Sequence, residues 1–194
     1  MSKNRNEVSY YPEIRNYIEQ QLKSNFRASR KKELYVYWGI GELKTKLHEI
    51  IENNPVTCGC VRHFAQNVPP LNLDIFAIIT DGKQFELLIL EIKLLKSVGL
   101  KEWSQLVGYC LVSGAKYGLL VNIDNGASKR LSDILSTEKN LSFIETNING
   151  RTHRHHLGCM CWDSVTQDFE YCNLGIIKSL SNLSQLLENE FVFN

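Results

Sequence analysis

The chain lacks any long hydrophobic segment. None of its apolar runs reaches the roughly 20 residues that a membrane-spanning helix needs. The N-terminus is polar and has no apolar core of a signal peptide, so we expect an intracellular, cytoplasmic protein that does not contact membranes. A net charge of +1 excludes a protein that binds polyanions indiscriminately, although basic residues can still gather locally.

Other absences exclude further classes of protein. The sequence has no internal repeat, no low-complexity tract, no glycine-rich phosphate-binding loop, and no zinc-finger or helix-turn-helix motif. With 194 residues and 43% hydrophobic content, the chain is too apolar to be disordered and long enough to bury a full core. We therefore expect one domain that spans residues 1–194.

Cysteine is present six times, and without an export signal a reducing compartment is the default. Two Cys-x-Cys pairs could place four sulfurs around a structural zinc ion if each pair lies on a strand; these are Cys58, Cys60, Cys159 and Cys161. The spacing lacks the turn that points two sulfurs at one ion, so zinc remains an alternative. The remaining two, Cys110 and Cys172, are better explained as small buried side chains.

The most informative part of the sequence is a predicted hairpin. Residues 71–80 and 85–94 are two strongly apolar segments, and the Asp-Gly pair between them indicates a tight turn. If Asp81 and Gly82 are the centre of this turn, Asp74 lies opposite Ile89. Asp74 is then a diagonal neighbour of Glu91, roughly 7–8 Å away at the backbone.

Alternation along the strands places Asp74, Glu91 and Lys93 on one face of this hairpin. Two carboxylates with waters and phosphate oxygens are enough to hold Mg²⁺, and an ammonium nearby can stabilise charge that develops on a phosphate. A structural ion pair is the alternative interpretation. Both strands are otherwise so apolar that they must be buried on both faces, so each acid needs a partner or a metal.

A second pattern follows this hairpin. Residues 97–114 are predicted to form a helix that carries Gln105 and Tyr109 in a Gln-x-x-x-Tyr spacing, and residues 117–124 are predicted to form a buried strand. A strand, a helix and a strand in this order favour a parallel crossover. The acid on one strand, followed by Glu-Ile-Lys at the end of the next, resembles the PD-(D/E)xK nuclease superfamily. The Gln-x-x-x-Tyr element is similar to that of its RecB-like members.

The resemblance covers about residues 8–125 and has Leu73 where the motif has proline. It implies an α/β fold with a central mixed β-sheet flanked by helices, in the restriction endonuclease-like αβββαβ order. Outside this core, residues 141–194 are predicted to add a hairpin and a helix. The apolar stripe of that helix, over 174–192, is expected to close the core or to form a homodimer contact.

The resemblance also implies a metal site. Asp74, Glu91 and the main-chain carbonyl of Ile92 would hold Mg²⁺, with Mn²⁺ as a substitute. Relatives often add a Glu from the first helix. Glu13 is the preferred candidate here, ahead of Glu19, although a solvated helix face explains both equally well.

The remaining roles follow in the same way. Lys93 would position or activate water, Gln105 would orient the site and Tyr109 would support it. Basic residues that could contact DNA are Lys96, Lys101, Arg30 and Lys31. We expect a Mg²⁺-dependent deoxyribonuclease, with an endonuclease preferred to an exonuclease. The alternatives are a non-catalytic nucleic-acid-binding protein and a zinc-organised adaptor on the same fold.

Overall fold

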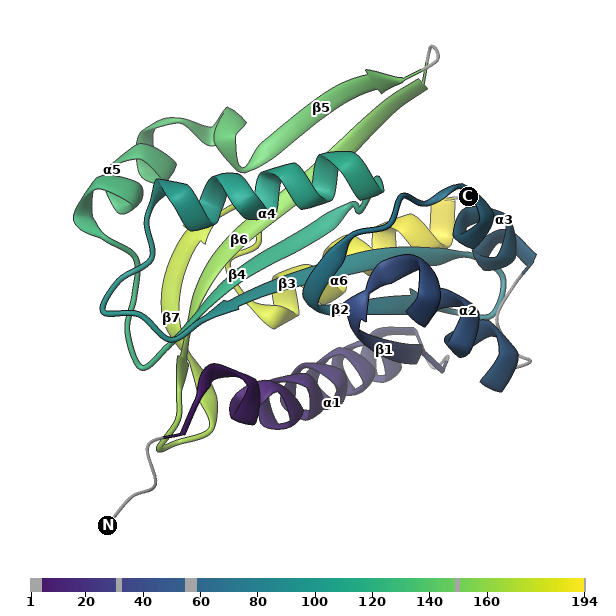
Figure 1. Cartoon of the computed structure of the whole chain (residues 1–194), viewed down its shortest axis with the longest axis horizontal. Coiled ribbons are helices and arrows are strands. Elements are labelled where there is room, and N and C mark those ends of the chain that lie inside the picture. The colour runs from purple at the N-terminus through teal and green to yellow at the C-terminus, as the bar shows by residue number, and fades with distance from the viewer. Residues whose placement is uncertain (1–4, 31–32, 55–58, 149–150, 194) are drawn as a thin grey trace.

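A computed structural model describes residues 5–30, 33–54, 59–148 and 151–193. In these parts of the chain, seven strands form one sheet in the order β1-β2-β3-β4-β6-β5, and β7 pairs with β6. The strands are β1 (Tyr35–Glu42), β2 (Asn72–Thr80), β3 (Phe85–Lys93), β4 (Tyr117–Ile123), β5 (Phe143–Ile148), β6 (Arg151–Asp163) and β7 (Asp168–Gly175). Figure 1 shows that β5 and the first half of β6 project beyond the rest of the sheet.

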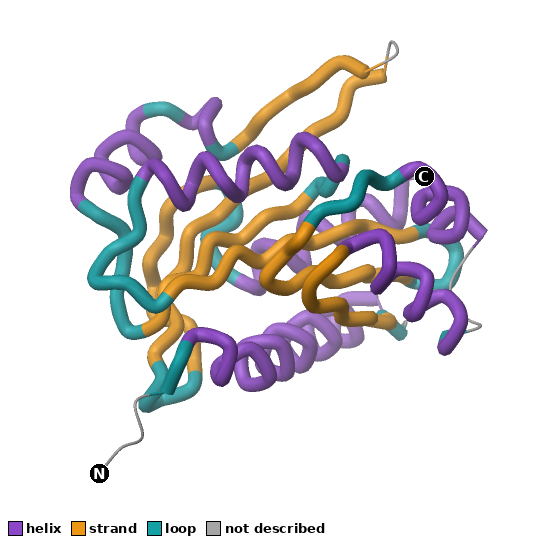
Figure 2. The backbone as a smooth tube through the Cα atoms, viewed as in Figure 1, coloured by secondary structure: helices purple, strands orange, loops and turns teal. Residues whose placement is uncertain are grey.

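Helices cover both faces of this sheet, as Figure 2 shows. They are α1 (Tyr11–Arg30), α2 (Leu43–Asn53), α3 (Gly59–Asn67), α4 (Leu100–Ser113), α5 (Lys129–Thr137) and α6 (Leu180–Phe193), with 3-10 turns η1 (Glu7–Tyr10) and η2 (Lys139–Leu141). One core lies between the sheet and α1 with α6, and a second lies between the sheet and helices α2 to α5. The expected mixed α/β architecture is confirmed.

The periodicity of α1 explains its place in the first core. Ile14, Ile18 and Leu22 recur every four residues and are fully buried, because this spacing puts them on one side of a helix. The apolar stripe of α6 packs into the same core, where Leu183 and Leu187 are fully buried. That stripe therefore closes the core, which was one of the two roles expected for it.

The β2–β3 hairpin is confirmed, but its register differs from the predicted one by two residues. Thr80 pairs with Phe85, so the loop is the four residues 81–84. The Asp81 carboxylate accepts hydrogen bonds from the main-chain N–H groups of both Lys83 and Gln84, which keeps those residues in the loop. Continuing this register puts Asp74 opposite Glu91, not opposite Ile89. A two-residue shift preserves the faces, so both acids still share one.

The parallel crossover from β3 through α4 to β4 is also confirmed, and β6 continues the parallel arrangement beside β4. The Glu102 side chain accepts the Gly99 N–H at the start of α4, and Gly114 ends the helix with φ of 74°. As a result, β3, β4 and β6 all end on the same side of the sheet. We call this side the carboxyl edge.

Three parts of the structure differ from the sequence predictions. The periodic patterns did not indicate β1 or α3, and α3 puts Cys60 on a helix, whereas the zinc alternative depended on strand positions for each Cys-x-Cys pair. The predicted helix over 174–192 begins later, at Leu180, because Leu174 still pairs with Cys159 in the β6–β7 ladder. Gly175 then adopts φ of 91°, which is costly for other residues and breaks the strand.

No helix in the described parts of the chain combines the length and the apolarity needed to cross a bilayer.

The edge opposite to the carboxyl edge holds a cluster of one ammonium and two carboxylates. Lys116 Nζ lies 3.4 Å from Glu86 Oε1 and 2.5 Å from Glu190 Oε2, and it thereby links β3 to α6. Burial raises the pKa of Glu86 to about 7; the Lys116 ammonium opposes this shift and the Glu190 charge adds to it. Ionisation of Glu86 therefore lowers the stability of the folded protein at neutral pH.

Replacing Glu86 tests this cost. Glu86 has a pKa of about 7 when folded and 4.5 ordinarily, so the native state binds the extra proton. The free energy of unfolding should then fall by up to about 3 kcal/mol as the pH rises from 4.5 to 7. Glu86→Gln should remove this component in urea denaturation at several pH values. Identical pH profiles for the two proteins would contradict the assignment.

A close approach between β1 and β2 gives a second test. Gly39 pairs with Phe76, and a Cβ atom added at Gly39 would lie 2.1 Å from the Phe76 ring. Gly39→Ala should therefore lower the free energy of unfolding by about 1–3 kcal/mol through overpacking. Gly108→Ala is the matched control, because its Cβ meets nothing within 4 Å and α4 gains a better helix former. Equal stability of both variants would refute this packing argument.

Candidate functional site

The carboxyl edge brings Asp74, Glu91 and Lys93 together. The β2–β3 pairing stops at Ile75 and Leu90, and the β1–β2 register shifts beside Asp74, between Gly39 and Gly41. Shifts of this kind re-aim side chains and end pairing. Asp74 therefore lies just outside the ladder, and its Oδ2 accepts the Ile92 N–H at 3.0 Å. The Asp74 carboxylate thus accepts the hydrogen bond that a main-chain carbonyl of β2 would accept if the ladder continued.

Lys93 lies between the two carboxylates. Its Nζ is 3.1 Å from Asp74 Oδ2 and 2.5 Å from Glu91 Oε1. The Glu91 side chain is only 1% exposed, whereas those of Lys93 and Asp74 are 18% and 26% exposed. The Lys93 ammonium is therefore the partner of this buried Glu91 oxygen. The site thus has one sealed carboxylate and one that solvent can reach.

Both buried charges have shifted pKa values. Burial raises the pKa of Glu91 to about 7; the Lys93 ammonium opposes this shift, and the charges of Asp74 and Glu7 add to it. Burial alone would lower the pKa of Lys93, but its contacts with Glu91 and Asp74 outweigh burial and raise it. Lys93 therefore remains an ammonium, and it partly compensates a carboxylate that is expensive to ionise.

The N-terminal segment adds two residues to this site that the sequence patterns did not single out. The Tyr11 hydroxyl donates to Glu7 Oε1 at 3.2 Å. Burial, together with the charges of Asp74 and Glu7, raises the pKa of Tyr11. Glu7 is thus the third carboxylate near the site, and Tyr11 lies between it and Asp74. The sequence did contain a signal, because Glu7 and Tyr11 are four residues apart and can meet across one helical turn.

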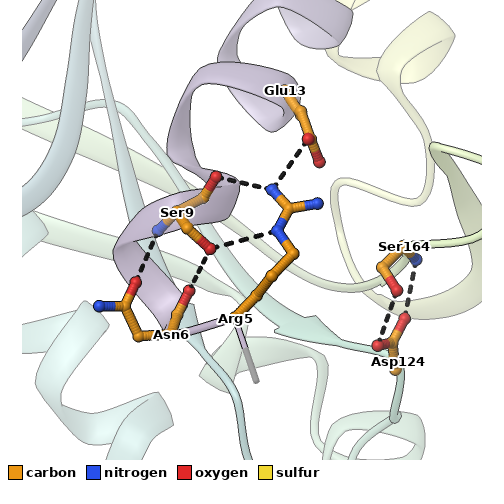
Figure 3. A network of polar contacts seen from close by, with 6 residues as sticks. All are labelled: Arg5, Asn6, Ser9, Glu13, Asp124 and Ser164. Atoms are coloured by element: carbon orange, nitrogen blue, oxygen red, sulfur yellow. Dashed lines mark hydrogen bonds and ion pairs between the residues drawn. The ribbon is translucent and has the colours of Figure 1, made fainter. Parts of the chain in front are cut away.

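Figure 3 shows what fixes this segment. Arg5 donates to the main-chain oxygen of Ser9 at 2.7 Å and to Glu13 Oε1 at 2.8 Å, and its guanidinium stacks 3.9 Å from the centre of the Tyr10 ring. The Asn6 side chain caps the same turn by accepting the Ser9 N–H. These contacts bind η1 to the first turn of α1 and hold Glu7 in place.

Glu13, the acid preferred from the sequence, points elsewhere. Its Oε1 is the partner of Arg5, and its side chain lines a pocket with Trp162. The structure therefore brings Glu7, and not Glu13, toward Asp74 and Glu91. A helix of 3.6 residues per turn explains the difference, because Tyr11 and Glu13 lie two positions apart and face different directions.

Asn122 is a further residue that the sequence patterns missed. It is fully buried and pairs with Lys93 in the β3–β4 ladder. Its Oδ1 accepts the Leu95 N–H at 3.1 Å, and its Nδ2 donates to the carbonyls of Leu95 at 3.0 Å and Gly126 at 3.3 Å. Asn122 therefore fixes the main chain two residues beyond Lys93.

The helix α4 contains the predicted Gln-x-x-x-Tyr element. Gln105 Nε2 donates to the Tyr109 hydroxyl at 3.0 Å, and both side chains are half-buried on one flank of the helix. This bond links the two residues of the element, and the roles predicted for them at the site stay predictions. The described contacts of Gln105 run to Tyr109 and not to the carboxylates.

Lys96 and Lys101 are exposed, on the loop after β3 and in the first turn of α4. Both therefore lie close in sequence to Lys93 on the side where β3 ends. Lys31 and the side chain of Arg30 lie outside the described residues, so the structure says nothing of their predicted role.

The described cysteines do not converge. Cys60 Sγ lies 3.8 Å from the carbonyl of Lys83, in the turn at the start of β3. Cys161 pairs with Asn122 and so lies level with Lys93, at the other end of that strand. Cys60 thus lies near the start of β3 and Cys161 lies level with its end. The nine residues of β3 span about 27–30 Å, so the two sulfurs are far apart. Among the described residues, no three His, Cys, Asp or Glu side chains form a group that could hold a metal; Cys58 lies outside them.

Comparisons with protein-family models, with curated proteins and with solved structures gave no match. The likeness to PD-(D/E)xK nucleases therefore remains an expectation from the sequence motif.

The buried position of Glu91 makes Lys93 a test of this geometry. Lys93→Met should lower the free energy of unfolding at pH 8 by about 1–3 kcal/mol, because it leaves a buried carboxylate without its cation. Lys23→Met removes the exposed Lys23–Glu19 pair and should cost about 0.5 kcal/mol or less. Urea denaturation measures both. A Lys93 variant as stable as the Lys23 variant would count against a buried ion pair.

Proposed function

We propose that this protein is a metal-dependent nuclease that hydrolyses DNA phosphodiester bonds at the carboxyl edge of β3. The observation that carries the proposal is the convergence of Asp74, Glu91 and Lys93 where the β2–β3 ladder ends. Ion pairs that only stabilise a fold need no opening in the ladder. Here one carboxylate is buried, the other is accessible, and the ammonium lies between them.

The donor set fits Mg²⁺. Asp74 and Glu91 supply carboxylate oxygens on either side of the Lys93 ammonium. The N–H and C=O of one strand residue point to the same side, so the Ile92 carbonyl faces the gap in which its N–H meets Asp74. Two carboxylates and one carbonyl, completed by water and phosphate oxygens, match the usual Mg²⁺ environment. Glu7 adds negative charge nearby.

Each residue of the chain then has a defined task. When bound, the metal polarises a phosphoryl oxygen and lowers the pKa of a coordinated water. Lys93, whose ammonium contacts both acids, would turn toward the phosphate and stabilise the negative charge of the transition state. Asn122 keeps the chain beyond Lys93 fixed, and the Tyr11 side chain interacts with Asp74.

The fold order supports the family assignment. A first helix, three strands, a helix and a further strand follow one another as α1, β1, β2, β3, α4 and β4, with α2 and α3 inserted after β1. This is the order of the restriction endonuclease-like core. Exposed Lys96 and Lys101 beside the site provide positive charge for a phosphate backbone.

Cleavage assays with Mg²⁺ or Mn²⁺ on linear, nicked and branched DNA test the proposal. Asp74→Asn and Glu91→Gln should each lower the cleavage rate about 100-fold or more, because each removes charge from the metal site. Both should also weaken Mn²⁺ binding in calorimetry. Glu86→Gln is the matched control, since it alters the other carboxylate–lysine cluster and should leave cleavage unchanged.

Two outcomes would reject the nuclease assignment. One is that no DNA form is cleaved and no metal binds at Asp74 and Glu91. The other is that the two variants unfold more readily while metal binding stays unchanged, which is the behaviour of a structural ion pair.

A further inference from the structure

The loops that follow β3 and β4 are joined side by side at the carboxyl edge. The Val98 N–H donates to the Gly126 carbonyl at 3.3 Å, and the Ser128 N–H donates to the Val98 carbonyl at 2.8 Å. These two bonds form a short parallel bridge between the loops. The two hydrogen bonds between the Asn122 side chain and the Leu95 main chain join the same segments closer to β3. The helices α4 and α5 therefore begin next to each other, as Figure 1 shows.

Four cationic side chains lie on the joined segments. Lys96 is in the loop after β3 and Lys101 in the first turn of α4, while Lys129 and Arg130 begin α5. All four are exposed, and none forms an ion pair with another residue in the described part of the chain. The sequence patterns singled out Lys96 and Lys101 only. The charges of all four are available to a partner.

The acids of these segments do not neutralise the four cations. Residues 94–102 and 124–132 contain two acids, Glu102 and Asp124. The Glu102 carboxylate accepts the Gly99 N–H at 2.9 Å, and both Asp124 oxygens accept hydrogen bonds from Ser164. Each carboxylate thus fixes a turn of the chain, and the joined loops carry a net positive charge.

The charges around the proposed metal site are segregated between the two faces of the sheet. Ile89, four residues before Lys93, packs into the core that contains α4 and α5, so Lys93 is on this face. Glu7 belongs to η1, which precedes the helix on the opposite face, and its charge acts on Glu91. The site therefore has a positive border toward α4 and α5 and a negative border toward η1.

We propose that the DNA backbone leaves the site over the joined loops, where Lys129 and Arg130 bind phosphates beyond those held by Lys96 and Lys101. Duplex DNA carries a phosphate charge about every 3.4 Å along each strand, so a line of cations beside the scissile phosphate meets successive phosphates. The positive border attracts this polyanion and the negative border at Glu7 repels it. This difference sets the direction of the backbone, from β3 across β4 toward α5.

The main chain holds these cations in place before DNA arrives. Because the loops are joined, the starts of α4 and α5 need no ordering on binding, and the cost of association falls. The path of the DNA rests on the proposed nuclease function, since that function places a phosphate at Lys93. Binding of DNA by Lys129 and Arg130 does not require catalysis, so the two proposals can be tested separately.

Binding of a short fluorescent DNA duplex in EDTA, measured by anisotropy at several salt concentrations, tests this surface. Lys129→Ala/Arg130→Ala should weaken binding tenfold or more at about 0.1 M salt, because two phosphate contacts and their counterion release are lost. Each lost contact should lower the slope of log K against log salt by about 0.9. The same should hold for Lys96→Ala/Lys101→Ala.

Lys83→Ala/Arg62→Ala is the matched control. It removes one lysine and one arginine that are also exposed and that form no ion pair among the described residues, so the change in net charge is the same. Lys83 lies in the β2–β3 loop, at the opposite end of β3 from Lys93, and Arg62 lies on α3. This variant should keep the affinity and the salt slope of the wild type. Thermal unfolding checks that every variant folds.

Three outcomes would overturn the proposal: the wild type fails to bind the duplex at low salt, Lys129→Ala/Arg130→Ala binds as the wild type does, or the control variant weakens binding equally. Cleavage in Mg²⁺ is measured separately. If the Lys129→Ala/Arg130→Ala variant loses affinity but the wild type cleaves no DNA form, this surface stands and the nuclease assignment fails. If the wild type cleaves DNA and the variant binds unchanged, the reverse holds.

Discussion

The hydrogen bond from the Ile92 N–H to the Asp74 carboxylate is the contact on which the site depends. It allows β2 to part from β3 without leaving a main-chain donor unsatisfied, which would be costly in so apolar a hairpin. Because the pairing of β2 with β3 stops here, Asp74 and Lys93 remain partly exposed to solvent, whereas Glu91 is buried beside them. The same bond fixes Asp74 relative to the strand that carries Glu91 and Lys93, so the geometry of the site follows from main-chain positions.

The surrounding elements serve this arrangement in different ways. Asn122 holds the chain beyond Lys93 through two hydrogen bonds to Leu95 and ties it to the loop after β4 through a third bond, to Gly126. The Arg5 contacts hold η1 so that Glu7 and Tyr11 lie near Asp74. The opposite edge contains a similar cluster around Lys116, but there the lysine links β3 to α6. The two clusters have similar composition. The one we propose to be catalytic differs in its position, because it lies where the pairing of β2 with β3 ends.

Much of the fold could be predicted from the sequence because its signals are local. The two apolar strands, the Asp-Gly turn and the spacing of Ile14 and Ile18 each fix an element through steric and solvation effects within a few residues. The shared face of Asp74 and Glu91 followed from alternation, and it survived the two-residue error in register because that error preserved parity. The error arose because the Asp81 side chain extends the loop to Gln84, a contact that the Asp-Gly pair alone does not reveal.

The rest depended on tertiary contacts. β1 contains two glycines and reads weakly as a strand, yet Gly39 is required where the Phe76 ring packs against it. Glu13 and Glu7 are equivalent acids in the sequence, and only the path of η1 decides which one faces Asp74. In the sequence Asn122 is one polar residue in an apolar strand. Its role could not be predicted, because its hydrogen-bond partners lie in two other segments, after β3 and after β4.

The lysine between the two carboxylates also bears on how the protein matures. Two acids forced together in a hydrophobic setting would repel each other, and many metal sites therefore become ordered only when their ion arrives. Here the polypeptide supplies its own cation, so the repulsion is already offset as the strands assemble. Under the function we propose, folding would thereby be independent of magnesium, and the ion would be needed only for the chemistry.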